Sequence, residues 1–187
     1  MMSMPKLVRF LFFASTFSSA RAYDCFATAF LSLHLCDRWI ACRDSGGTQC
    51  DDGNGNLGTR LKMQSKHFTG IIPPADLANM TALTHLSLPN NQLSGPIPTE
   101  IGLCTALTRV YLYGNQLSGP IPTEIGQCTA IEELSLDNNQ LNGTIPTEIG
   151  QCTAIDYLRL ANNQLSGQIP TEIGQCAALA TLRLEDN

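Results

Sequence analysis

One stretch decides how this chain folds: Leu83-Thr-His-Leu-Ser-Leu-Pro-Asn-Asn-Gln-Leu-Ser-Gly-Pro-Ile-Pro-Thr-Glu-Ile-Gly-Leu-Cys-Thr-Ala106. Near-copies of the same length follow directly, without insertions, and begin at Leu107, Ile131 and Ile155. A partial copy runs from Leu179 to Asn187, and a degenerate earlier copy runs from about Leu57 to Ala82. A fixed period of this length is the sequence signature of a solenoid.

Each copy predicts a short strand and a buried asparagine. Leu86 and Leu88 are separated by one residue, and this alternation is typical of a strand with one buried face. The asparagine that follows can donate to and accept from backbone groups that a buried turn leaves unpaired. Lys66 takes this position in the degenerate copy, so we expect the asparagine ladder to begin one coil later. Its members are Asn91, Asn115, Asn139, Asn163 and Asn187.

The second half of each copy predicts a tight bend and then a short helical turn. Gly95 permits the bend because glycine has no Cβ. Pro98 suits the first position of a helical turn, and Glu100 then lies at the positive end of that turn. We expect Leu93 and Ile97 to point into the core.

The segment 1–22 predicts a cleaved secretory signal peptide. Lys6 and Arg9 give it a basic start, residues 7–17 are mostly apolar, and Ala20-Arg21-Ala22 fits a small-x-small cleavage site. The apolar run is too short to span a bilayer, so a membrane anchor is the less favoured alternative. No later stretch is long and apolar enough to span one, so we expect no membrane insertion and a secreted, extracellular mature chain.

The charge of the mature chain limits its partners. Removing residues 1–22 removes three basic residues and no acidic one, so the formal net charge changes from −5 to −8. Nucleic acids and anionic membrane surfaces both require a basic footprint, so neither is an expected partner. The charge is compatible with protein, peptide or neutral glycan ligands.

Four cysteines at irregular spacing precede the repeats, in residues 23–56. In a secreted chain they predict two disulfides in a small cap. Such a cap would cover the apolar end of the first coil. Three pairings are possible, of which we favour Cys36–Cys42, which leaves Cys25–Cys50.

Four further cysteines occupy one fixed position of the repeat. Met80 holds the same position in the degenerate copy, which indicates a buried apolar slot. A straight column does not converge as a tetrahedral zinc site requires. We therefore expect buried, reduced thiols, with disulfides between coils as the less favoured alternative, at Cys104, Cys128, Cys152 and Cys176.

These motifs resemble the plant-type leucine-rich repeat, LxxLxLxxNxLSGxIPxxIGxLxx, over residues 57–187 as one degenerate, four full and one partial repeat. Cys36-Asp-Arg-Trp39-Ile-Ala-Cys42 resembles the paired-cysteine cap of that family but lacks the Gly-Val usually found before the second cysteine. The resemblance implies an α/β solenoid: a right-handed arc with a concave parallel sheet, short helical or 3-10 turns on the convex side, and an N-terminal disulfide cap. No C-terminal cap is expected.

The resemblance also implies ligand binding on the concave face. The family includes secreted inhibitors of cell-wall-degrading enzymes and ectodomains of receptor kinases. The outward strand positions break the repetition here and hold three of the four tyrosines of the chain. Tyrosine and arginine are favoured as interface anchors, although any exposed sheet face can present them. The predicted ligand-binding patch comprises Arg109, Tyr111, Tyr113, Glu133, Asp137, Tyr157 and Arg159.

No enzyme, cofactor or metal site is expected from the sequence. His34, His67 and His85 lie far apart in this register, and no nucleophile–base pair, phosphate loop or paired-carboxylate cleft can be placed. A column of glutamates, Glu100 and its copies, could suggest calcium, but a solvated face explains it better. The expected function is a secreted recognition module, in a more specific version an inhibitor of a secreted hydrolase. The alternatives are an N-terminal fragment of a receptor ectodomain and a structural surface protein that uses its Thr/Glu rows.

The sequence also contains two sites for N-linked glycosylation. Asn79-Met-Thr81 and Asn142-Gly-Thr144 are acceptor sequons, which we expect on the flanks, away from the concave strands.

Leu182 and Leu184 would lie at the exposed end of an uncapped last coil with an open sheet edge. That edge predicts fraying, an edge-to-edge homodimer or a continuation of the chain.

Overall fold

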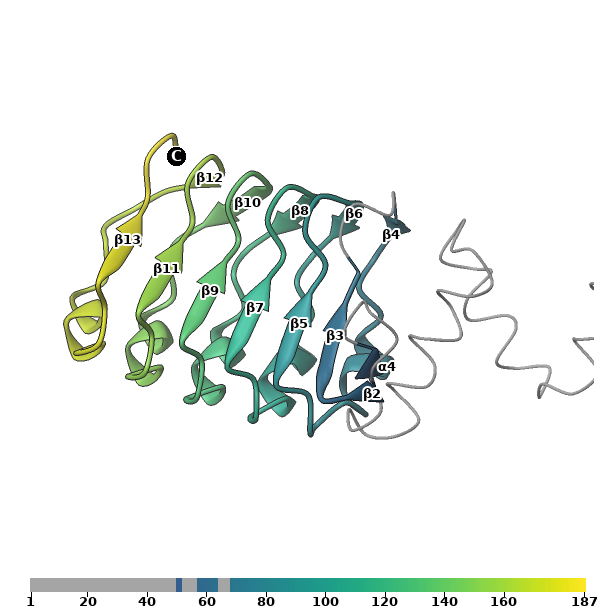
Figure 1. Ribbon diagram of the computed structural model, residues 1–187. Helices are drawn as coiled ribbons and strands as arrows, with labels where there is room; N and C mark the ends of the chain where they lie inside the picture. Colours follow the sequence, from purple (N-terminus) through teal and green to yellow (C-terminus); the bar gives the residue numbers. More distant parts are fainter. Residues whose placement is uncertain (1–49, 52–56, 64–67) are drawn as a thin grey trace, which may run out of the picture.

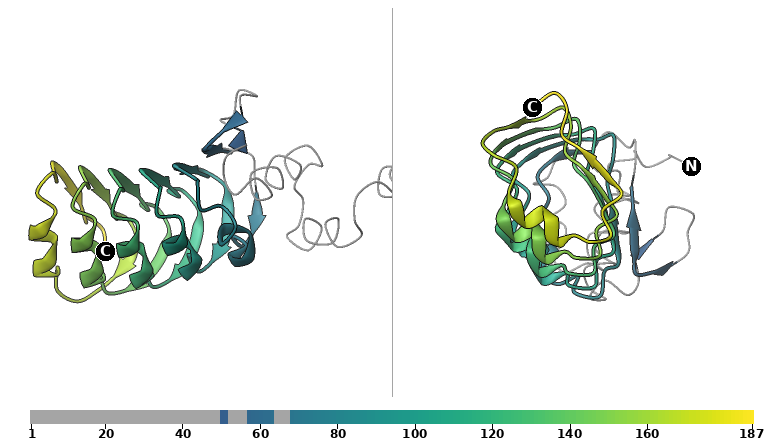
Figure 2. Two further views of the ribbon diagram at one scale, coloured as in Figure 1. Left: turned by 90° about the horizontal axis from the view of Figure 1, so that it is seen from below. Right: turned by 90° about the vertical axis from the view of Figure 1, so that its left-hand side faces the viewer.

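The computed structural model describes residues 50–51, 57–63 and 68–187 of the 187-residue chain. The predicted signal peptide (residues 1–22) and most of the predicted cap (residues 23–56) lie outside this part. Each repeat makes one coil, and the coils stack side by side into a solenoid (Figure 1). Viewed end-on, each coil encloses the core between two sheets and a row of short turns (Figure 2). The predicted solenoid is therefore confirmed.

The concave face is one parallel sheet of six strands, in which sequential coils are neighbours. Leu86 pairs with Val110 across the ladder, and Val110 pairs with Leu134. The constant length of the repeat brings the same repeat position to the same place in every coil, which confirms the predicted Leu-x-Leu strand. The strands are β3 (Arg60–Lys62), β5 (His85–Ser87), β7 (Arg109–Tyr111), β9 (Glu133–Ser135), β11 (Tyr157–Arg159) and β13 (Thr181–Arg183).

A second parallel sheet of five strands lies on the flank, where the sequence predicted only a bend. Gly95 ends its strand with φ of 75°, as the predicted bend requires. The strands are β4 (Thr69–Gly70), β6 (Gln92–Gly95), β8 (Gln116–Gly119), β10 (Gln140–Gly143) and β12 (Gln164–Leu165). Before the first coil, β1 (Cys50–Asp51) and β2 (Leu57–Gly58) form an antiparallel pair.

Short helical turns close each coil on the convex side, as predicted. The position predicted for the proline was wrong: Pro98 is extended, with φ of −66° and ψ of 141°, and precedes the turn instead of starting it. The fixed φ of proline suits both the first residue of the turn and the residue before it. The extended ψ of Pro98 places it before the turn. The turns are α4 (Pro74–Leu77), η1 (Thr99–Leu103), η2 (Thr123–Gln127), η3 (Thr147–Gln151) and η4 (Thr171–Gln175).

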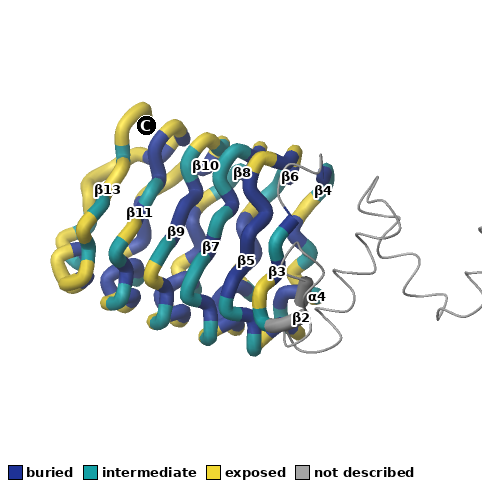
Figure 3. Tube along the Cα trace, in the orientation of Figure 1, coloured by how far each residue is buried: buried dark blue, intermediate teal, exposed yellow. Residues whose placement is uncertain are grey.

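The predicted asparagine ladder runs along the buried turn after the concave strands. Nδ2 of Asn115 donates to the carbonyl of Leu88 at 3.0 Å in the preceding coil and to that of Leu112 at 2.9 Å in its own coil. Its Oδ1 accepts from the backbone N–H of Leu93 at 3.1 Å. Equivalent bonds begin at Asn91 and continue to Asn187. The inside of the central coils is buried, and exposure increases at the last coil (Figure 3).

The cysteine column fills a buried slot with free thiols, as predicted. Met80 occupies the same slot in the first coil and is fully buried. Each thiol donates to a turn carbonyl of the preceding coil; Sγ of Cys128, for example, lies 3.2 Å from the carbonyl oxygen of Ile101. Burial raises the pKa of the Cys104 and Cys152 thiols to about 11 and that of Cys128 to about 12. These thiols are therefore un-ionised at neutral pH.

Candidate functional site on the concave sheet

Three neighbouring strands, β7, β9 and β11, position the candidate residues. Their parallel register places Arg109 beside Glu133 and Glu133 beside Tyr157. Two residues further along the same strands, Ser135 lies between Tyr111 and Arg159. Residues one repeat apart in the sequence thus become direct neighbours on one face, where side chains of adjacent strands interact.

Arg109 and Glu133 form the ionic centre of one side of the site. Nε of Arg109 lies 2.9 Å from Oε1 of Glu133, and Nη2 lies 3.7 Å from Oε2 of Glu132. The hydroxyl of Tyr111 donates to the other oxygen of Glu133 at 2.5 Å. Both carboxylate oxygens of Glu133 are therefore occupied within the protein.

Tyr111 is held as a neutral hydrogen-bond donor. Burial of the ring, followed by the hydrogen bond to Glu133 and the negative charge of that carboxylate, raises the pKa of Tyr111 to about 12. The positive charge of Arg109 acts in the opposite direction and is outweighed. Tyr111 consequently remains protonated throughout the physiological range and fixes the orientation of Glu133.

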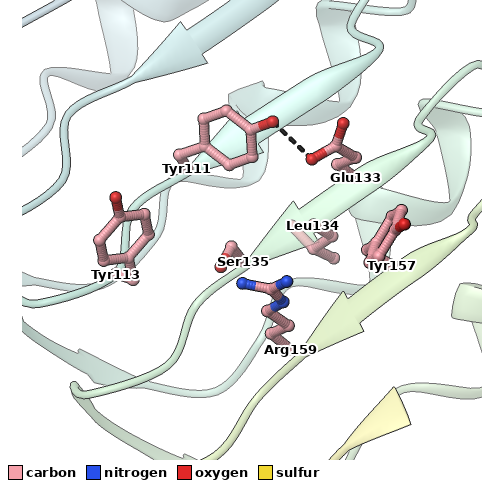
Figure 4. A pocket seen from close by; sticks show the side chains of 7 residues that line it. All are labelled: Tyr111, Tyr113, Glu133, Leu134, Ser135, Tyr157 and Arg159. Atoms are coloured by element: carbon pink, nitrogen blue, oxygen red, sulfur yellow. Dashed lines mark hydrogen bonds between the residues drawn. The ribbon is translucent and has the colours of Figure 1, made fainter. Parts of the chain in front are cut away.

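A pocket of about 200 Å³ opens beside Tyr111 and Glu133, and we call it the tyrosine pocket. Side chains of three tyrosines and Arg159 surround it, with Leu134 and Ser135 between them (Figure 4). The pocket residues are Tyr111, Tyr113, Glu133, Leu134, Ser135, Tyr157 and Arg159. The structure thus brings five of the seven predicted patch residues into one concavity.

Arg159 is the open charge of the tyrosine pocket. Its Cζ lies 5.7 Å from the centroid of the Tyr157 ring, a cation–π contact. Its Nε is buried and has no hydrogen-bond partner. No acidic side chain of the described residues forms an ion pair with Arg159. The ion pairs around the site are both made by Arg109. The site therefore offers a guanidinium that lacks an acceptor.

The two remaining patch residues lie outside the pocket wall. Arg109 is engaged by Glu133 and by His85, whose Nε2 lies 3.1 Å from Nη1 of Arg109. Asp137 accepts from the Ser135 hydroxyl at 2.9 Å. Sequence reasoning did not select Ser135 or Leu134. Ser135 is 5% exposed and looked like an ordinary outward strand position, so only its neighbours in space identify it.

Other predicted sites are placed as follows. Asn79 and Asn142 lie away from the concave strands, Asn79 after α4 and Asn142, which is exposed, in β10. Of the predicted disulfide residues, only Cys50 is described, in β1, whereas Cys25, Cys36 and Cys42 lie outside the described residues. In the described ranges no group of three or more His, Cys, Asp or Glu side chains is arranged to hold a metal ion. Those ranges also contain no helix of sufficient length and hydrophobicity to span a bilayer.

Comparison with known proteins agrees with the fold. Residues 82–104, 106–128, 130–152 and 154–176 match the Leucine Rich Repeat family. The ectodomain of the Arabidopsis thaliana membrane receptor kinase GASSHO1/SCHENGEN3, solved with CASPARIAN STRIP INTEGRITY FACTOR 2, is 40% identical with a TM-score of 0.65. That match covers 67% of this chain and 15% of the receptor chain. No curated protein sequence matches the chain significantly.

Shorter ectodomains align over most of their length. The ectodomain of the Arabidopsis thaliana receptor kinase SOBIR1 is 30% identical with a TM-score of 0.65, over 73% of this chain and 76% of that chain. A chain of the BIR3–SERK2 complex from the same plant is 32% identical with a TM-score of 0.60, over 75% and 76% of the two chains. In contrast, this chain spans a fifth or less of the GASSHO1/SCHENGEN3 and RGFR1 chains.

Proposed function

Because the chain belongs to the plant-type leucine-rich repeat family, we propose that it is a non-enzymatic, secreted recognition module that binds a peptide or protein on its concave face. One observation supports this proposal above the others. The tyrosine pocket gathers three aromatic rings around a guanidinium that has no acceptor within the described part of the protein. Tyrosine and arginine contribute strongly to interfaces when they converge at the centre of a desolvated patch.

The charges of the pocket favour a ligand with an acidic group. Glu133 is already neutralised by Arg109 and bonded to Tyr111, so it does not compete for Arg159. A carboxylate of the ligand can therefore bind the Arg159 guanidinium in a bidentate manner. The rings of Tyr113 and Tyr157 supply the adjacent apolar surface.

The solved relatives favour a peptide or protein ligand over a glycan. GASSHO1/SCHENGEN3 and RGFR1 were solved with CASPARIAN STRIP INTEGRITY FACTOR 2 and RGF2, respectively. The match to SOBIR1 over about three-quarters of both chains supports a short ectodomain as a functional analogue. The alternative proposals are an inhibitor of a secreted hydrolase and the N-terminal part of a longer receptor ectodomain. The predicted signal peptide is the basis for secretion in each case.

A structural surface protein is the less favoured candidate. Such a protein would use the threonine and glutamate rows of the convex side to bind a solid surface with a regular repeat. Thr99 and its copies donate their hydroxyls to the adjacent glutamate carboxylates at 3.2–3.3 Å. These hydroxyls are therefore already engaged within the protein.

The test is affinity capture from extracellular medium with the chain from residue 23 onward, followed by binding assays with the captured partner. Arg159→Glu and Tyr157→Ala should each weaken binding at least tenfold, because both remove interface anchors. Arg183→Glu, on the neighbouring strand β13 and outside the pocket, is the matched charge control and should bind normally. Normal binding by Arg159→Glu and Tyr157→Ala would refute the concave-pocket proposal.

We also propose that the 187-residue chain self-associates through its last coil. β13 has a neighbouring strand on one side only, and Leu182 is 39% exposed. Unpaired strand edges favour pairing with another chain. Sedimentation at increasing protein concentration should reveal dimers that Leu182→Lys abolishes. Leu103→Lys, at a leucine in η1 that is 49% exposed, is the control and should leave the dimer intact.

A further inference from the structure

A second concavity lies away from the concave sheet and is lined by the segments that connect the flank sheet to the convex turns. Figure 2 shows these two parts of each coil. This groove of about 710 Å³ crosses three coils and is bordered at one end by Pro74 of the coil before them; we call it the flank groove. Each coil contributes the same segment to it, which in the first of them is Pro96 to Glu100. The next two coils contribute residues 120–124 and 144–148.

The flank groove has an apolar floor and wall. Ile97 and Ile121 are each 4% exposed, and Pro98 and Pro122 are buried beside them. The ring of Pro120, like that of Pro96, is exposed and forms part of the wall. A partner segment in this groove would therefore bury apolar surface against proline and isoleucine side chains.

One rim of the flank groove is a row of three carboxylates. Oε2 of each glutamate accepts from the hydroxyl of the threonine before it, at 3.2–3.3 Å. No lysine or arginine of the described residues forms an ion pair with any of them. The rim therefore presents three negative charges that this part of the protein leaves uncompensated, at Glu100, Glu124 and Glu148.

These features define the conformation and charge of the partner. The hydroxyls of Thr99, Thr123 and Thr147 already donate to the rim glutamates, so the groove lining offers few donors to the backbone of an incoming strand. A polyproline II segment requires no backbone partner and docks on apolar grooves. Its turn of three residues advances about 9 Å. Two coils advance about 10 Å at the usual spacing of strands in a sheet.

We propose that the flank groove binds a polyproline II segment of a partner protein that carries a basic residue at every third position. The apolar residues of the segment lie on the proline and isoleucine floor. The basic side chains follow one edge and pair with the carboxylates two coils apart, Glu100 and Glu148. This interaction is separate from ligand binding at the tyrosine pocket, with which the groove shares no residue.

The next coil, residues 155–178, supplies the internal control. The wall position holds proline in the first two groove coils, Thr144 in the third and Gln168 here. Ile169 is 56% exposed, whereas Ile145 of the third groove coil is 9% exposed, and neither Gln168 nor Ile169 lines the groove. Glu172 nevertheless keeps the same bond, 3.3 Å from the Thr171 hydroxyl. It is thus chemically equivalent to the rim glutamates but lies outside the flank groove.

The probe is fluorescein-labelled (Pro-Pro-Lys)4, titrated with the chain from residue 23 onward and followed by fluorescence anisotropy at low ionic strength. The triple variant Glu100→Gln, Glu124→Gln and Glu148→Gln should weaken binding about tenfold, since exposed ion pairs contribute modestly and add. The control triple Glu132→Gln, Glu172→Gln and Glu185→Gln removes the same charge outside the groove and should bind like the parent. Circular dichroism checks that all variants are folded.

Two further measurements distinguish binding in the flank groove from non-specific electrostatic binding. Pro120→Gln, which copies Gln168 of the coil beyond the groove, should weaken binding of the probe at least threefold. (Ala-Ala-Lys)4 carries the same charge without the polyproline conformation and should bind at least threefold more weakly. Equal loss in the two triple variants, or equal binding of the two peptides, would overturn the proposal.

Discussion

Nη1 of Arg109 donates a hydrogen bond to Nε2 of His85 over 3.1 Å, between the neighbouring strands β7 and β5. The bond requires an imidazole whose proton is on Nδ1, where it is donated to the Thr84 hydroxyl at 3.0 Å. Burial of the ring, and then the positive charges of Arg60, Arg109 and Lys62, lower the pKa of His85 to about 4. The opposing effect of the Glu133 carboxylate is the smallest. His85 is therefore uncharged at neutral pH.

This lowered pKa predicts a loss of stability in mild acid. The unfolded chain binds a proton at His85 below a pH of about 6.5, whereas the folded chain does so only near 4. The stabilisation is thus present above 6.5 and is lost as the pH falls from 6.5 to 4. We expect the free energy of unfolding to fall on the order of 1 kcal/mol between pH 7 and pH 5, measured by urea denaturation. His85→Gln should lack this part of the pH dependence, and an unchanged pH profile in that variant would contradict the assignment.

Removing one member of the asparagine ladder should be costly. Asn115→Ala leaves the carbonyls of Leu88 and Leu112 and the N–H of Leu93 without their partner in a buried turn. We expect the free energy of unfolding to fall by about 3 kcal/mol, since each buried unpaired group costs about 1–3 kcal/mol. Gln116→Ala, at the exposed next position, should change it by less than about 0.5 kcal/mol. Urea denaturation of the two variants provides the comparison.

Two equivalent glycines should respond differently to alanine. A Cβ at Gly126 would lie 2.6 Å from the carbonyl oxygen of Glu148 in the next coil, whereas a Cβ at Gly174 would meet no atom within 4 Å. Gly126→Ala should destabilise the protein by about 1–3 kcal/mol, as overpacking does. Gly174→Ala should be neutral or slightly stabilising because alanine restricts the unfolded chain. Similar melting temperatures for the two variants would contradict the close stacking of the turns.

The thiol column should resist alkylation in the folded state. At pH 8 a thiol with a pKa of about 11 or more is ionised in about one molecule in a thousand or fewer, and only the thiolate reacts. Iodoacetamide should therefore label Cys104, Cys128 and Cys152 only after denaturation. Cys176 is 5% exposed, in the last full repeat, and should be the first of the four to react. Mass spectrometry of timed digests gives the order, and rapid labelling of Cys128 in the native protein would be inconsistent with the buried slot.

Glycosylation should occur at both sequons when the chain is secreted from a eukaryotic cell. Asn142 and Thr144 replace the serine and proline found in the first two full repeats, and together they create one acceptor. Asn142→Gln should remove one glycan from the intact mass. Thr144→Pro, which restores the proline of those repeats, should remove the same glycan because proline cannot replace the hydroxyl residue of a sequon. Asn79→Gln should remove the second glycan, and an unchanged mass in these variants would contradict the assignment.

The sequence could also have revealed a position that was overlooked. The residue before each ladder asparagine has a left-handed backbone, with φ between 53° and 67°. Only residue types that tolerate this conformation occur there, namely Asn90, Gly114, Asn138, Asn162 and Asp186. The restriction to Asn, Gly and Asp was visible in the repeats and is sufficient to predict the turn.

The sequence by itself determined the scaffold, because each element of the coil depends on residues close together in one repeat. The concave strand, the asparagine ladder, the convex turn and the cysteine slot all follow from the repeated pattern. The flank sheet does not: β6 contains Gln92 to Gly95, a segment without strand periodicity, and it becomes a strand because neighbouring coils pair with it.

Only the tertiary structure decided which patch residues are available to a ligand. The sequence treated Arg109 and Arg159 alike, as outward arginines on strands two coils apart. In the folded protein Glu133 pairs with Arg109 and accepts from Tyr111, whereas Arg159 has no acidic neighbour within ion-pair distance in the described part of the chain. The difference arises from the directions of side chains that lie one or two repeats apart in the sequence. No local pattern encodes those directions, so the open charge of the tyrosine pocket emerges only when the coils are stacked.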